Sequence, residues 1–391
     1  MSAETINGAR IVLETLHRLG VTDMFGYPGG AVIPIYDEIY SFPEIKHYFV
    51  RHEQGAAHAA DGYARVSGKV GVCLATSGPG ATNLVTGIMT AYMDSVPMVA
   101  ITGQVGRALI GKDSFQEADI QGITMPITKH NYLVQDIHDL PRIIKEAYFI
   151  AGTGRPGPVL IDIPKDIQTE KISMAEYNKL YDVPIQLEGY DPTYKGHQGQ
   201  IKKAATLIKN AKRPLIIAGA GVLKSGAMAE LKALAEKAQI PVANTLVGLG
   251  GFPGNHELAL GMVGMHGSVA ANNCTEDADL VIAAGIRFHD RITGHPDFFC
   301  KKAKIIHIDI DPAEIDKNVT INVPIVGDLK RVLTELNTLV EPTTHESWIE
   351  QIREWQQEYP MVVPESTHGE LHPQYVLSEL NKIAKDDAII V

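Results

Sequence analysis

The 391-residue sequence predicts an α/β protein with two doubly wound parallel-sheet domains, followed by the start of a third α/β domain. Three observations predict this class. Apolar strand-like segments alternate with helical segments, Gly and Pro residues separate them, and a polar stretch divides the alternation into two runs. Hydrophobic residues make up 45% of the chain and charged residues 21%, so the sequence has enough apolar content for sizeable cores.

The first domain is predicted over residues 1–168. It begins with an amphipathic helix at 6–19, where the apolar positions recur with helical spacing and Gly20 follows as a cap. Helices are also predicted at 53–66 and 141–151. Five apolar segments are predicted as the strands of this domain: 23–27, 46–50, 70–75, 98–102 and 159–163.

The rest of the chain is predicted as a linker, a second sheet domain and a short final segment. Residues 169–199 are polar and turn-rich, and are interpreted as a linker with little core of its own. The central domain spans 200–341, with helices at 200–210 and 329–339 and strands at 214–218, 241–245, 280–284, 304–310 and 323–326. A linker helix (346–358) and loop complete 342–372. Residues 373–391 are expected to form a helix (373–384) and a strand (387–391) of a domain that is cut short.

Charge and cysteine content exclude several classes of function. Lys and Arg total 35 against 46 Asp and Glu, a net charge of −11, so nucleic acid and anionic membranes are poor partners. Three scattered cysteines are too few for a disulfide framework or metal cage, which fits a cytoplasmic protein. The N-terminus lacks the basic character of an export signal. Residues 70–93 carry no charge, but Gly78-Pro79-Gly80 favours a strand, turn and helix over a membrane span.

Three strand ends in the first domain carry residues that suit a binding cleft. Glu53 lies in the strand-to-helix turn RHEQG, and glycine turns follow the neighbouring strands at 26–30 (GYPGG) and 77–83 (SGPGATN). Taken singly, Glu53 would favour the dipole at the N-terminus of a helix, and each glycine would form a tight turn. Together they predict a cleft in which the backbone approaches a flat ligand closely.

The segments GYPGG, HEQGAAHAADGYAR and TSGPGATN resemble the pyrimidine-binding domain of thiamine-diphosphate enzymes. Across its whole length the chain resembles the large catalytic subunit of the acetohydroxyacid (acetolactate) synthase family. The resemblance implies that Glu53 bonds to a ring nitrogen of the aminopyrimidine, favouring the tautomer that generates the cofactor's ylid. It also implies a backbone amide of Gly30 near the reacting carbon, and cofactor contacts from Tyr27, Gly78, Pro79 and Asn83. Relatives that make tartronate semialdehyde have an apolar residue in place of Glu53, which argues against that activity.

Two further segments match the family's substrate pocket. Ser114-Phe115-Gln116-Glu117 resembles its FQE motif, and Pro164-Lys165-Asp166 resembles its PKD motif. The resemblance implies that Phe115 lines the site, Gln116 lies near the cofactor and takes a catalytic role, and Lys165 stands at the entrance for the second ketoacid. Without the resemblance, Phe115 would be expected in the core and Lys165 as a solvated surface charge.

The second domain resembles the family's flavin-binding middle domain. The resemblance implies FAD in a structural role, held by residues of short glycine turns and strand ends: Arg155, Gly219, Gly221, Met265, His266, Gly267, Gly285, Arg287, Asp309 and Asp328. Arg291 matches the arginine that selects the carboxylate of the second ketoacid. His289 departs from the family pattern, which has an aspartate there. Without the resemblance, the single GxG at Gly219-Ala220-Gly221 would be weak evidence of a nucleotide site. Asp309 and Asp311 would then be read as turn-forming residues.

The family holds Mg²⁺ and the cofactor's diphosphate through a GDG motif and a later NN pair. The sequence contains no GDG, and the closest segment, Val326-Gly327-Asp328-Leu329, continues differently. No residue of this sequence is therefore assigned as a metal ligand, and Mg²⁺ is expected to bind through a region outside it. For this reason residues 1–391 alone are expected to form no acetolactate and to bind thiamine diphosphate weakly or not at all. Flavin is the one cofactor that they could retain.

The resemblance implies decarboxylation of pyruvate on thiamine diphosphate and transfer of the hydroxyethyl unit to a second 2-ketoacid, either pyruvate or 2-ketobutyrate. This is the first common step of branched-chain amino acid biosynthesis. The alternatives are another thiamine-diphosphate enzyme, such as pyruvate oxidase or sulfoacetaldehyde acetyltransferase, and a non-catalytic nucleotide-binding module. The expected partners are small 2-ketoacids, further copies in a homodimer or homotetramer, and a small regulatory subunit.

Overall fold

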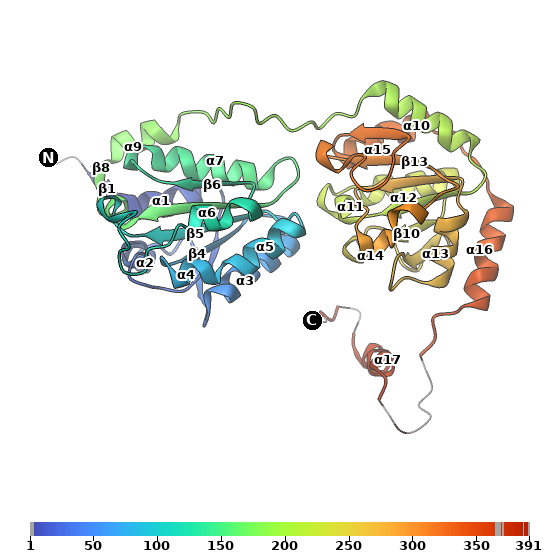
Figure 1. Ribbon diagram of the computed structural model, residues 1–391, viewed down its shortest axis with the longest axis horizontal. Coiled ribbons are helices and arrows are strands. Elements are labelled where there is room, and N and C mark those ends of the chain that lie inside the picture. Colours follow the sequence, from blue (N-terminus) through green and yellow to red (C-terminus); the bar gives the residue numbers. More distant parts are fainter. Residues whose placement is uncertain (1–3, 364–368, 370, 386, 390–391) are drawn as a thin grey trace. The chain divides into compact units, whose positions relative to one another are not determined.

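The computed structural model describes residues 4–363, 369, 371–385 and 387–389. The chain folds into two compact units, Met1–Pro192 (unit 1) and Thr193–Val391 (unit 2). Each unit contains a six-stranded parallel sheet with helices on both faces (Figure 1). The predicted α/β class with two parallel-sheet domains is confirmed.

The sheet of unit 1 has the strand order β3-β2-β4-β5-β7-β6, and every neighbouring pair is parallel. Its strands are β2 (Asp23–Gly26), β3 (Lys46–Phe49), β4 (Gly71–Ala75), β5 (Met98–Gln104), β6 (His130–Leu133) and β7 (Pro158–Pro164). The central strands β4, β5 and β7 are buried along their whole length, as expected for apolar runs in a parallel sheet. The prediction missed β6, because this edge strand reads HNYL and has neither an apolar run nor a clean alternation.

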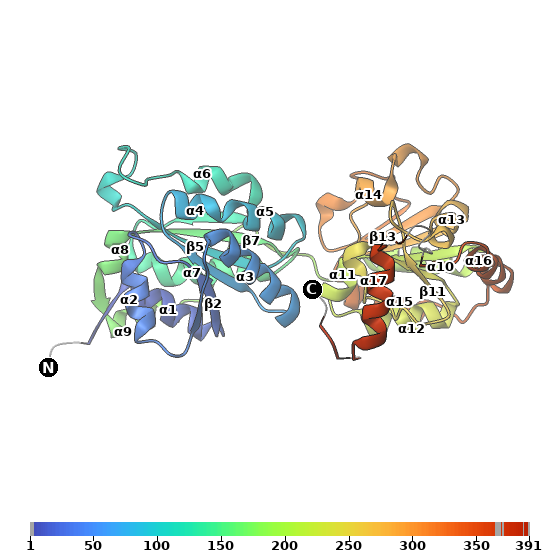
Figure 2. The same cartoon turned by 90° about the horizontal axis from the view of Figure 1, so that it is seen from below.

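Helices cover both faces of this sheet (Figure 1). One face packs against α1 (Gly8–Arg18), α2 (Ile33–Tyr40), α7 (Leu140–Gly152) and α9 (Met174–Tyr181). The other face packs against α3 (Glu53–Ser67), α4 (Pro79–Asn83) and α5 (Val85–Met93). The buried face of α3 includes four alanines, Ala56, Ala57, Ala60 and Ala64, whose small side chains let this helix lie close to the sheet. The short helix α6 (Ile120–Thr124) lies beside α4 (Figures 1 and 2).

Two predictions for unit 1 need correction. The first helix begins at Gly8 rather than residue 6, because the Asn7 side chain accepts a hydrogen bond from Arg10 N and caps it at 2.7 Å. Thr5–Asn7 instead form β1, which pairs antiparallel with β8 (Lys171–Ser173). The prediction that 169–199 has little core is therefore wrong for its first part. The residues of β8 and α9 belong to unit 1, where Tyr177 is fully buried.

The sheet of unit 2 has the order β11-β10-β9-β12-β13-β14 and is also parallel throughout. Its strands are β9 (Pro214–Ala218), β10 (Val242–Asn244), β11 (Ala259–Met262), β12 (Leu280–Ala284), β13 (Lys304–Asp309) and β14 (Val323–Val326). Only β11 was missed. This short edge strand contains Gly261 at φ +77°, and a glycine inside a strand weakens the sequence signal.

Six helices form the two helical layers of unit 2. On one face lie α10 (Gln198–Asn210), α11 (Ala220–Lys224), α12 (Met228–Ala238) and α15 (Leu329–Leu339). On the other face lie α13 (Val269–Asp277) and α16 (Glu346–Glu358). The interpretation of 346–358 as a linker helix is wrong, because Trp348 of α16 is buried and its Nε1 donates to Pro214 O at 3.0 Å.

The last predicted elements are described only in part. The helix predicted at 373–384 is α17 (Pro373–Ile383). Of the expected strand, residues 387–389 adopt no strand conformation, and Ile390 and Val391 lie outside the described residues. Residues 364–368 and 370 of the expected loop also lie outside them. Among the residues that are described, no helix has the length and apolar character to cross a membrane, and the uncharged segment 70–93 forms β4, α4 and α5.

The close packing of α3 and α5 gives a direct test of the unit 1 core. A Cβ added at Gly87 would lie 2.4 Å from Ala57 Cβ, whereas one added at Gly62, in the same helical layer, meets nothing within 4 Å. Gly87→Ala should lower the free energy of unfolding by about 1–3 kcal/mol because it overpacks the core. Gly62→Ala should raise it by about 0.5–1 kcal/mol through helix propensity. Urea unfolding followed by circular dichroism measures both, and equal effects would contradict the packing.

Candidate active site

The strand order of unit 1 places its best ligand site between β2 and β4. Within this sheet the chain forms β2 first, adds β3 on one side, and then continues with β4 on the other side. Ligands of such sheets bind beyond the carboxyl ends of the strands at this reversal. The predicted segments follow these three strands: 26–30 follows β2, Glu53 follows β3, and 77–83 follows β4. The fold therefore brings all three together at one edge, as the sequence predicted.

Glu53 is the first residue of α3, yet its side chain turns into the protein. The His52 Nδ1 atom accepts a hydrogen bond from Gln54 N at 3.2 Å and caps the helix, so the cap does not use the Glu53 carboxyl group. Glu53 is only 9% exposed, and its Oε2 accepts a hydrogen bond from Asn83 Nδ2 at 2.9 Å. A Cβ at Gly80 would lie 3.2 Å from Glu53 Oε1. The carboxyl group thus joins the start of α3 to the end of α4, and its second oxygen lies close to Gly80.

Uncharged polar groups lie in the surroundings of Glu53. The Tyr36 hydroxyl is 3.1 Å from His47 Nε2. Burial, with a contribution from the negative charge of Glu53, raises the pKa of Tyr36 well above its usual range. Burial also lowers the pKa of His47. Both side chains are therefore uncharged at pH 7, and Glu53 can provide a carboxyl group directed at a ligand hydrogen-bond donor.

The turn after β4 touches the loop that carries Phe115 and Gln116. Gly78 has φ +57°, and a Cβ there would lie 2.6 Å from Gln116 O, so only glycine allows this approach. Gln116 also has a positive φ of +57°, which is unusual for this residue type. Its side chain is exposed, and Phe115 is 87% exposed rather than part of the core. The structure therefore places the Gln116 backbone, rather than its side chain, against the glycine turn.

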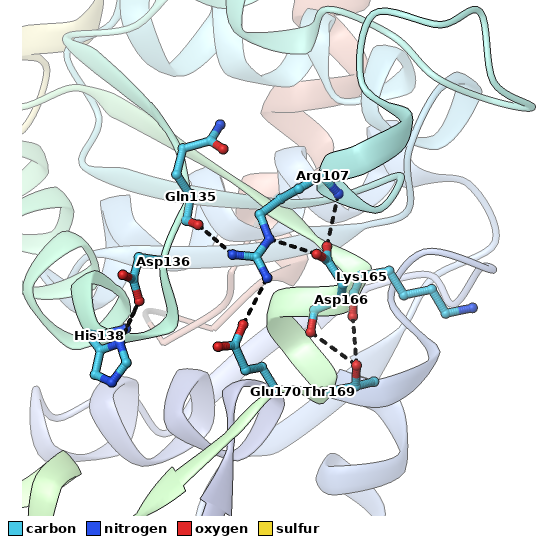
Figure 3. A network of polar contacts seen from close by, with 8 residues as sticks. All are labelled: Arg107, Gln135, Asp136, His138, Lys165, Asp166, Thr169 and Glu170. Atoms are coloured by element: carbon cyan, nitrogen blue, oxygen red, sulfur yellow. Dashed lines mark hydrogen bonds and ion pairs between the residues drawn. The ribbon is translucent and has the colours of Figure 1, made fainter.

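An exposed cluster of ion pairs holds the start of this loop (Figure 3). Arg107, in the short helix η1 (Arg107–Leu109), donates to Asp166 Oδ2 at 2.7 Å, to Glu170 Oε2 at 2.9 Å and to Gln135 O at 2.8 Å. Asp166 belongs to α8 (Lys165–Thr169), whose first residue, Lys165, is exposed and points away from Arg107 (Figure 3). The cluster fixes the loop next to the segment that carries Lys165.

A buried carboxyl group lies beneath the same loop. Asp162 in β7 is 2% exposed, and it accepts hydrogen bonds from Thr102 Oγ1 at 2.7 Å and from Gln104 Nε2 at 2.9 Å. Burial raises the pKa of Asp162 to about 7, although both hydrogen bonds act to lower it, and the charge of Asp119 raises it further. Sequence reasoning missed this residue. The available signal was a single acidic residue inside an otherwise apolar strand.

The remaining predicted residues of unit 1 have mixed surroundings. The Tyr27 ring packs against Phe49, with 5.2 Å between ring centroids, and is half-buried. Gly30 and Pro79 are exposed beside the site. Arg155 is half-buried and its Nε donates to Ser95 Oγ at 2.8 Å. Tyr27, Gly30 and Pro79 thus follow the two strands that flank the reversal, whereas Arg155 lies in the turn that precedes β7.

The order of strands in unit 2 reverses between β9 and β12, and the predicted glycine turns meet there. A Cβ at Gly219 would lie 2.2 Å from Gly285 O, and one at Gly221 would lie 2.6 Å from Gly285 Cα. The contact between the two turns therefore already requires glycine at these positions, without a ligand. It also brings both turns to the carboxyl edge of the sheet, where a ligand of this fold is expected.

The segments with Met265 and Arg291 also lie side by side. Met265 N donates to Arg291 O at 2.9 Å, which joins the turn at 264–267 (GMHG) to α14 (Asp290–Thr293). Met265, His266 and Arg291 are exposed at this edge, while Gly267 is half-buried. His289 caps α14, because its Nδ1 accepts from Arg291 N at 3.2 Å. The histidine thus does what an aspartate at the same position can also do.

The acidic residues at the strand ends have local structural roles. Asp309 Oδ1 accepts a hydrogen bond from Asp311 N, and Asp311 Oδ1 accepts one from Ala313 N, both at 2.9 Å. Asp328 Oδ1 accepts from Arg331 N at 3.0 Å and caps α15. Arg287 is half-buried, and its carbonyl accepts from Asn318 Nδ2 at 3.4 Å. Within the described part of the chain, no three His, Cys, Asp or Glu side chains are grouped to hold a metal ion.

Two domains of one enzyme family match these two units. Residues 6–123 match the thiamine pyrophosphate enzyme N-terminal TPP binding domain, and residues 201–336 match the thiamine pyrophosphate enzyme central domain. The acetolactate synthase large subunit of Buchnera aphidicola is 47% identical over 391 residues, which cover 99% of this chain and 68% of the relative. The chain belongs to the acetolactate synthase large-subunit family.

Other relatives extend this similarity across bacteria and archaea. Acetolactate synthase of Mycobacterium bovis is 50% identical over 397 residues, covering 100% of this chain and 63% of that protein. The probable acetolactate synthase large subunit of Methanocaldococcus jannaschii is 53% identical over 352 residues, covering 89% of this chain and 59% of that protein. The chain thus spans under two thirds of the length of these two relatives.

The buried Asp162 predicts a pH dependence of stability. Its pKa is about 7 in the folded protein and about 3.9 in an unfolded chain, so the folded state holds the extra proton between these values. The stabilisation is complete below pH 4 and is lost as the pH rises through 7, with a slope of about 1.4 kcal/mol per pH unit. Asp162→Asn should remove this slope.

Urea unfolding between pH 4.5 and 8 measures the difference between the two proteins. Glu146→Gln is the matched control, because Glu146 is a buried carboxyl of the same unit that bonds to Tyr132 and Arg142 rather than to Gln104. Its profile should keep the Asp162 slope. Parallel profiles for the native protein and Asp162→Asn would contradict the pKa assigned to Asp162.

Proposed function

We propose that the full-length protein is the catalytic subunit of an acetolactate synthase. It would decarboxylate pyruvate and join the two-carbon unit to a second 2-ketoacid, pyruvate or 2-ketobutyrate, in branched-chain amino acid biosynthesis. The observation that carries this proposal is the buried Glu53–Asn83 pair at the β2/β4 reversal, in a chain whose relatives bear this name. The names of several relatives also support a small regulatory subunit as a partner.

The contacts of Glu53 support it as the residue that would bind the aminopyrimidine ring of thiamine diphosphate. Glu53 offers a carboxyl oxygen, and Gly80 packs close beside it, where a Cβ would lie 2.6 Å from Thr76 Cγ2 and 3.2 Å from Glu53 Oε1. Asn83 holds the other oxygen, which fixes the direction of the carboxyl group. Among relatives of this family, thiamine diphosphate supplies a carbon nucleophile that adds to the ketone of the substrate.

In this proposal the residues of the chain orient the cofactor and the substrate and exclude water. Glu53 would exchange a proton with a ring nitrogen of the bound pyrimidine, and its low exposure would limit competition from water. Gly30 follows β2, and the Gln116 backbone lies against Gly78 in the turn after β4. Phe115 and Lys165 are exposed residues of the loop and of α8, and would contact the ketoacid. Arg291 in unit 2 presents a guanidinium, which suits a carboxylate.

FAD is proposed for unit 2, and Mg²⁺ for a region outside this sequence. The glycine turns of Gly219 and Gly285 lie at the carboxyl edge of the sheet, and Met265 and His266 of the same unit are exposed. These features fit an elongated dinucleotide. No grouped metal ligands occur in the described ranges, so no residue here is proposed to bind Mg²⁺.

The proposal includes assembly and location. We propose a homodimer or homotetramer in which a second subunit completes the site, and a cytoplasmic protein. Pyruvate oxidase and sulfoacetaldehyde acetyltransferase chemistry remain the alternatives on the same fold. The names of the relatives favour acetolactate synthase over both.

Glu53→Gln tests the role of the carboxyl group. Glutamine has the same shape and can still accept the hydrogen bond from Asn83, so the fold should be kept, but it cannot exchange a proton. We expect kcat for acetolactate formation in the full-length enzyme to fall by about 100-fold or more. Acetolactate is measured alongside acetyl phosphate, which separates the proposed reaction from the alternatives.

Glu146→Gln serves as the control for this change as well, since it replaces a buried carboxyl of the same unit that bonds to Tyr132 rather than to Asn83. Its turnover should match that of the native enzyme. Near-normal turnover of Glu53→Gln would refute the assigned role. Acetyl phosphate as the main product of the native enzyme would refute the proposed reaction.

Flavin binding has a readout that does not require activity. The 391-residue chain should quench the fluorescence of added FAD, and His266→Ala should weaken the binding about fivefold, through the loss of about one hydrogen bond. His295→Ala, which changes another exposed histidine of unit 2, should leave the affinity unchanged. Equal affinities for all three proteins would exclude His266 from the flavin site, and absence of quenching would exclude flavin binding by unit 2.

A further inference from the structure

The side chain of Gln104 closes the base of the loop that carries Phe115 and Gln116. Gln104 is the last residue of β5, and its Oε1 accepts a hydrogen bond from Val105 N at 2.9 Å, where the loop leaves the strand. Its Nε2 donates to Ala118 O at 2.9 Å, where the loop returns. One buried amide therefore joins two backbone positions that are separated by thirteen residues along the chain.

Asp162 fixes the direction of that amide. Gln104 Nε2 also donates to Asp162 Oδ2 at 2.9 Å, so the nitrogen must face β7 and the oxygen must face Val105. Asp162 is held in turn by Thr102 Oγ1 at 2.7 Å. All three side chains are buried, with exposed fractions of 0–4%. Because an unpaired polar group there would be costly, the network favours one arrangement of the loop base.

The position of the loop matters at the candidate site. Its Gln116 carbonyl packs directly against Gly78, in the turn that leads to Asn83, the partner of Glu53. Gln116 also holds a positive φ, a conformation that persists where the surroundings enforce it. A shift of the loop base would move the Gln116 backbone away from this turn.

We propose that Gln104 and Asp162 are positioning residues, which together form a buried clamp that holds loop 105–118 against the pyrimidine pocket. The kinetic consequence rests on the proposed function, because Phe115 and Gln116 are there proposed to face the ketoacid and the cofactor. The ion pairs of Arg107 hold the same loop from outside, but exposed pairs of this kind contribute little. The buried clamp therefore anchors the loop base from the inside, in addition to these exposed pairs.

Gln104→Met removes all three hydrogen bonds while keeping the length of the side chain, and Gln104→Asn keeps an amide that is too short to reach Ala118. In both variants the amides of 105–118 should exchange with deuterium about tenfold faster. Asp162→Asn is the conservative variant. Its oxygen can accept from Gln104 and its nitrogen can donate to Thr102 Oγ1, so exchange should stay close to native.

Exchange is measured by mass spectrometry on the 391-residue chain. Amides of β4 report whether unit 1 remains folded, and Glu146→Gln is the control. In the full-length enzyme, both Gln104 variants should raise KM for pyruvate about tenfold with a smaller change in kcat. The single variant Asp162→Asn should keep the native KM.

Unchanged exchange of 105–118 in the Gln104 variants, with β4 still protected, would overturn the clamp. Asp162→Asn behaving as poorly as Gln104→Met would overturn the hydrogen-bond account of it. Faster exchange without a change in KM would overturn the positioning role. If the native full-length enzyme forms no acetolactate, the proposed function fails, while the exchange experiment still decides whether the clamp exists.

Discussion

All strands of a parallel sheet end at the same edge, and this constraint determines where the functional residues of both units lie. In unit 1 the reversal of strand order between β2 and β4 gathers the segments at 26–30, Glu53 and 77–83. The same reversal in unit 2, between β9 and β12, brings Gly219 against Gly285. Residues far apart in sequence thus meet because they follow neighbouring strands that end at the same edge. The Glu53–Asn83 hydrogen bond is the most direct product of this constraint.

Most of the fold could be predicted from the sequence, because buried parallel strands are continuous apolar runs. Strands such as Pro214–Ala218 and Leu280–Ala284 match their predicted bounds. The misses are the edge strands β6 and β11 and the short pair β1 and β8, which have mixed polarity and depend on tertiary partners. The same reason explains α16 and α9. A helix with one buried aromatic residue, such as Trp348 or Tyr177, reads as a linker until its neighbours are known.

The parts of the candidate site that contain sequence motifs were predicted. The parts that depend only on contacts between distant residues were missed. The positions of Glu53, Gly78 and Asn83 follow from strand ends and glycine turns, which are visible in the sequence. The network of Gln104, Asp162 and Ala118 joins positions that no local pattern connects. Three of the predicted flavin-site glycines have a simpler structural reason than a ligand, since the turns of Gly219, Gly221 and Gly285 pack on one another. A flavin site and the packing of the two turns both require glycine at these positions, so the sequence alone cannot distinguish the two reasons.

The central claim is that the edge between β2 and β4 holds an aminopyrimidine ring through Glu53. A crystal structure of the full-length enzyme with thiamine diphosphate tests this most directly. We predict the pyrimidine ring at this edge, with a Glu53 carboxyl oxygen within about 3 Å of a ring nitrogen and Asn83 still bonded to the other oxygen. A ring bound elsewhere, or Glu53 turned away from it, would contradict the account.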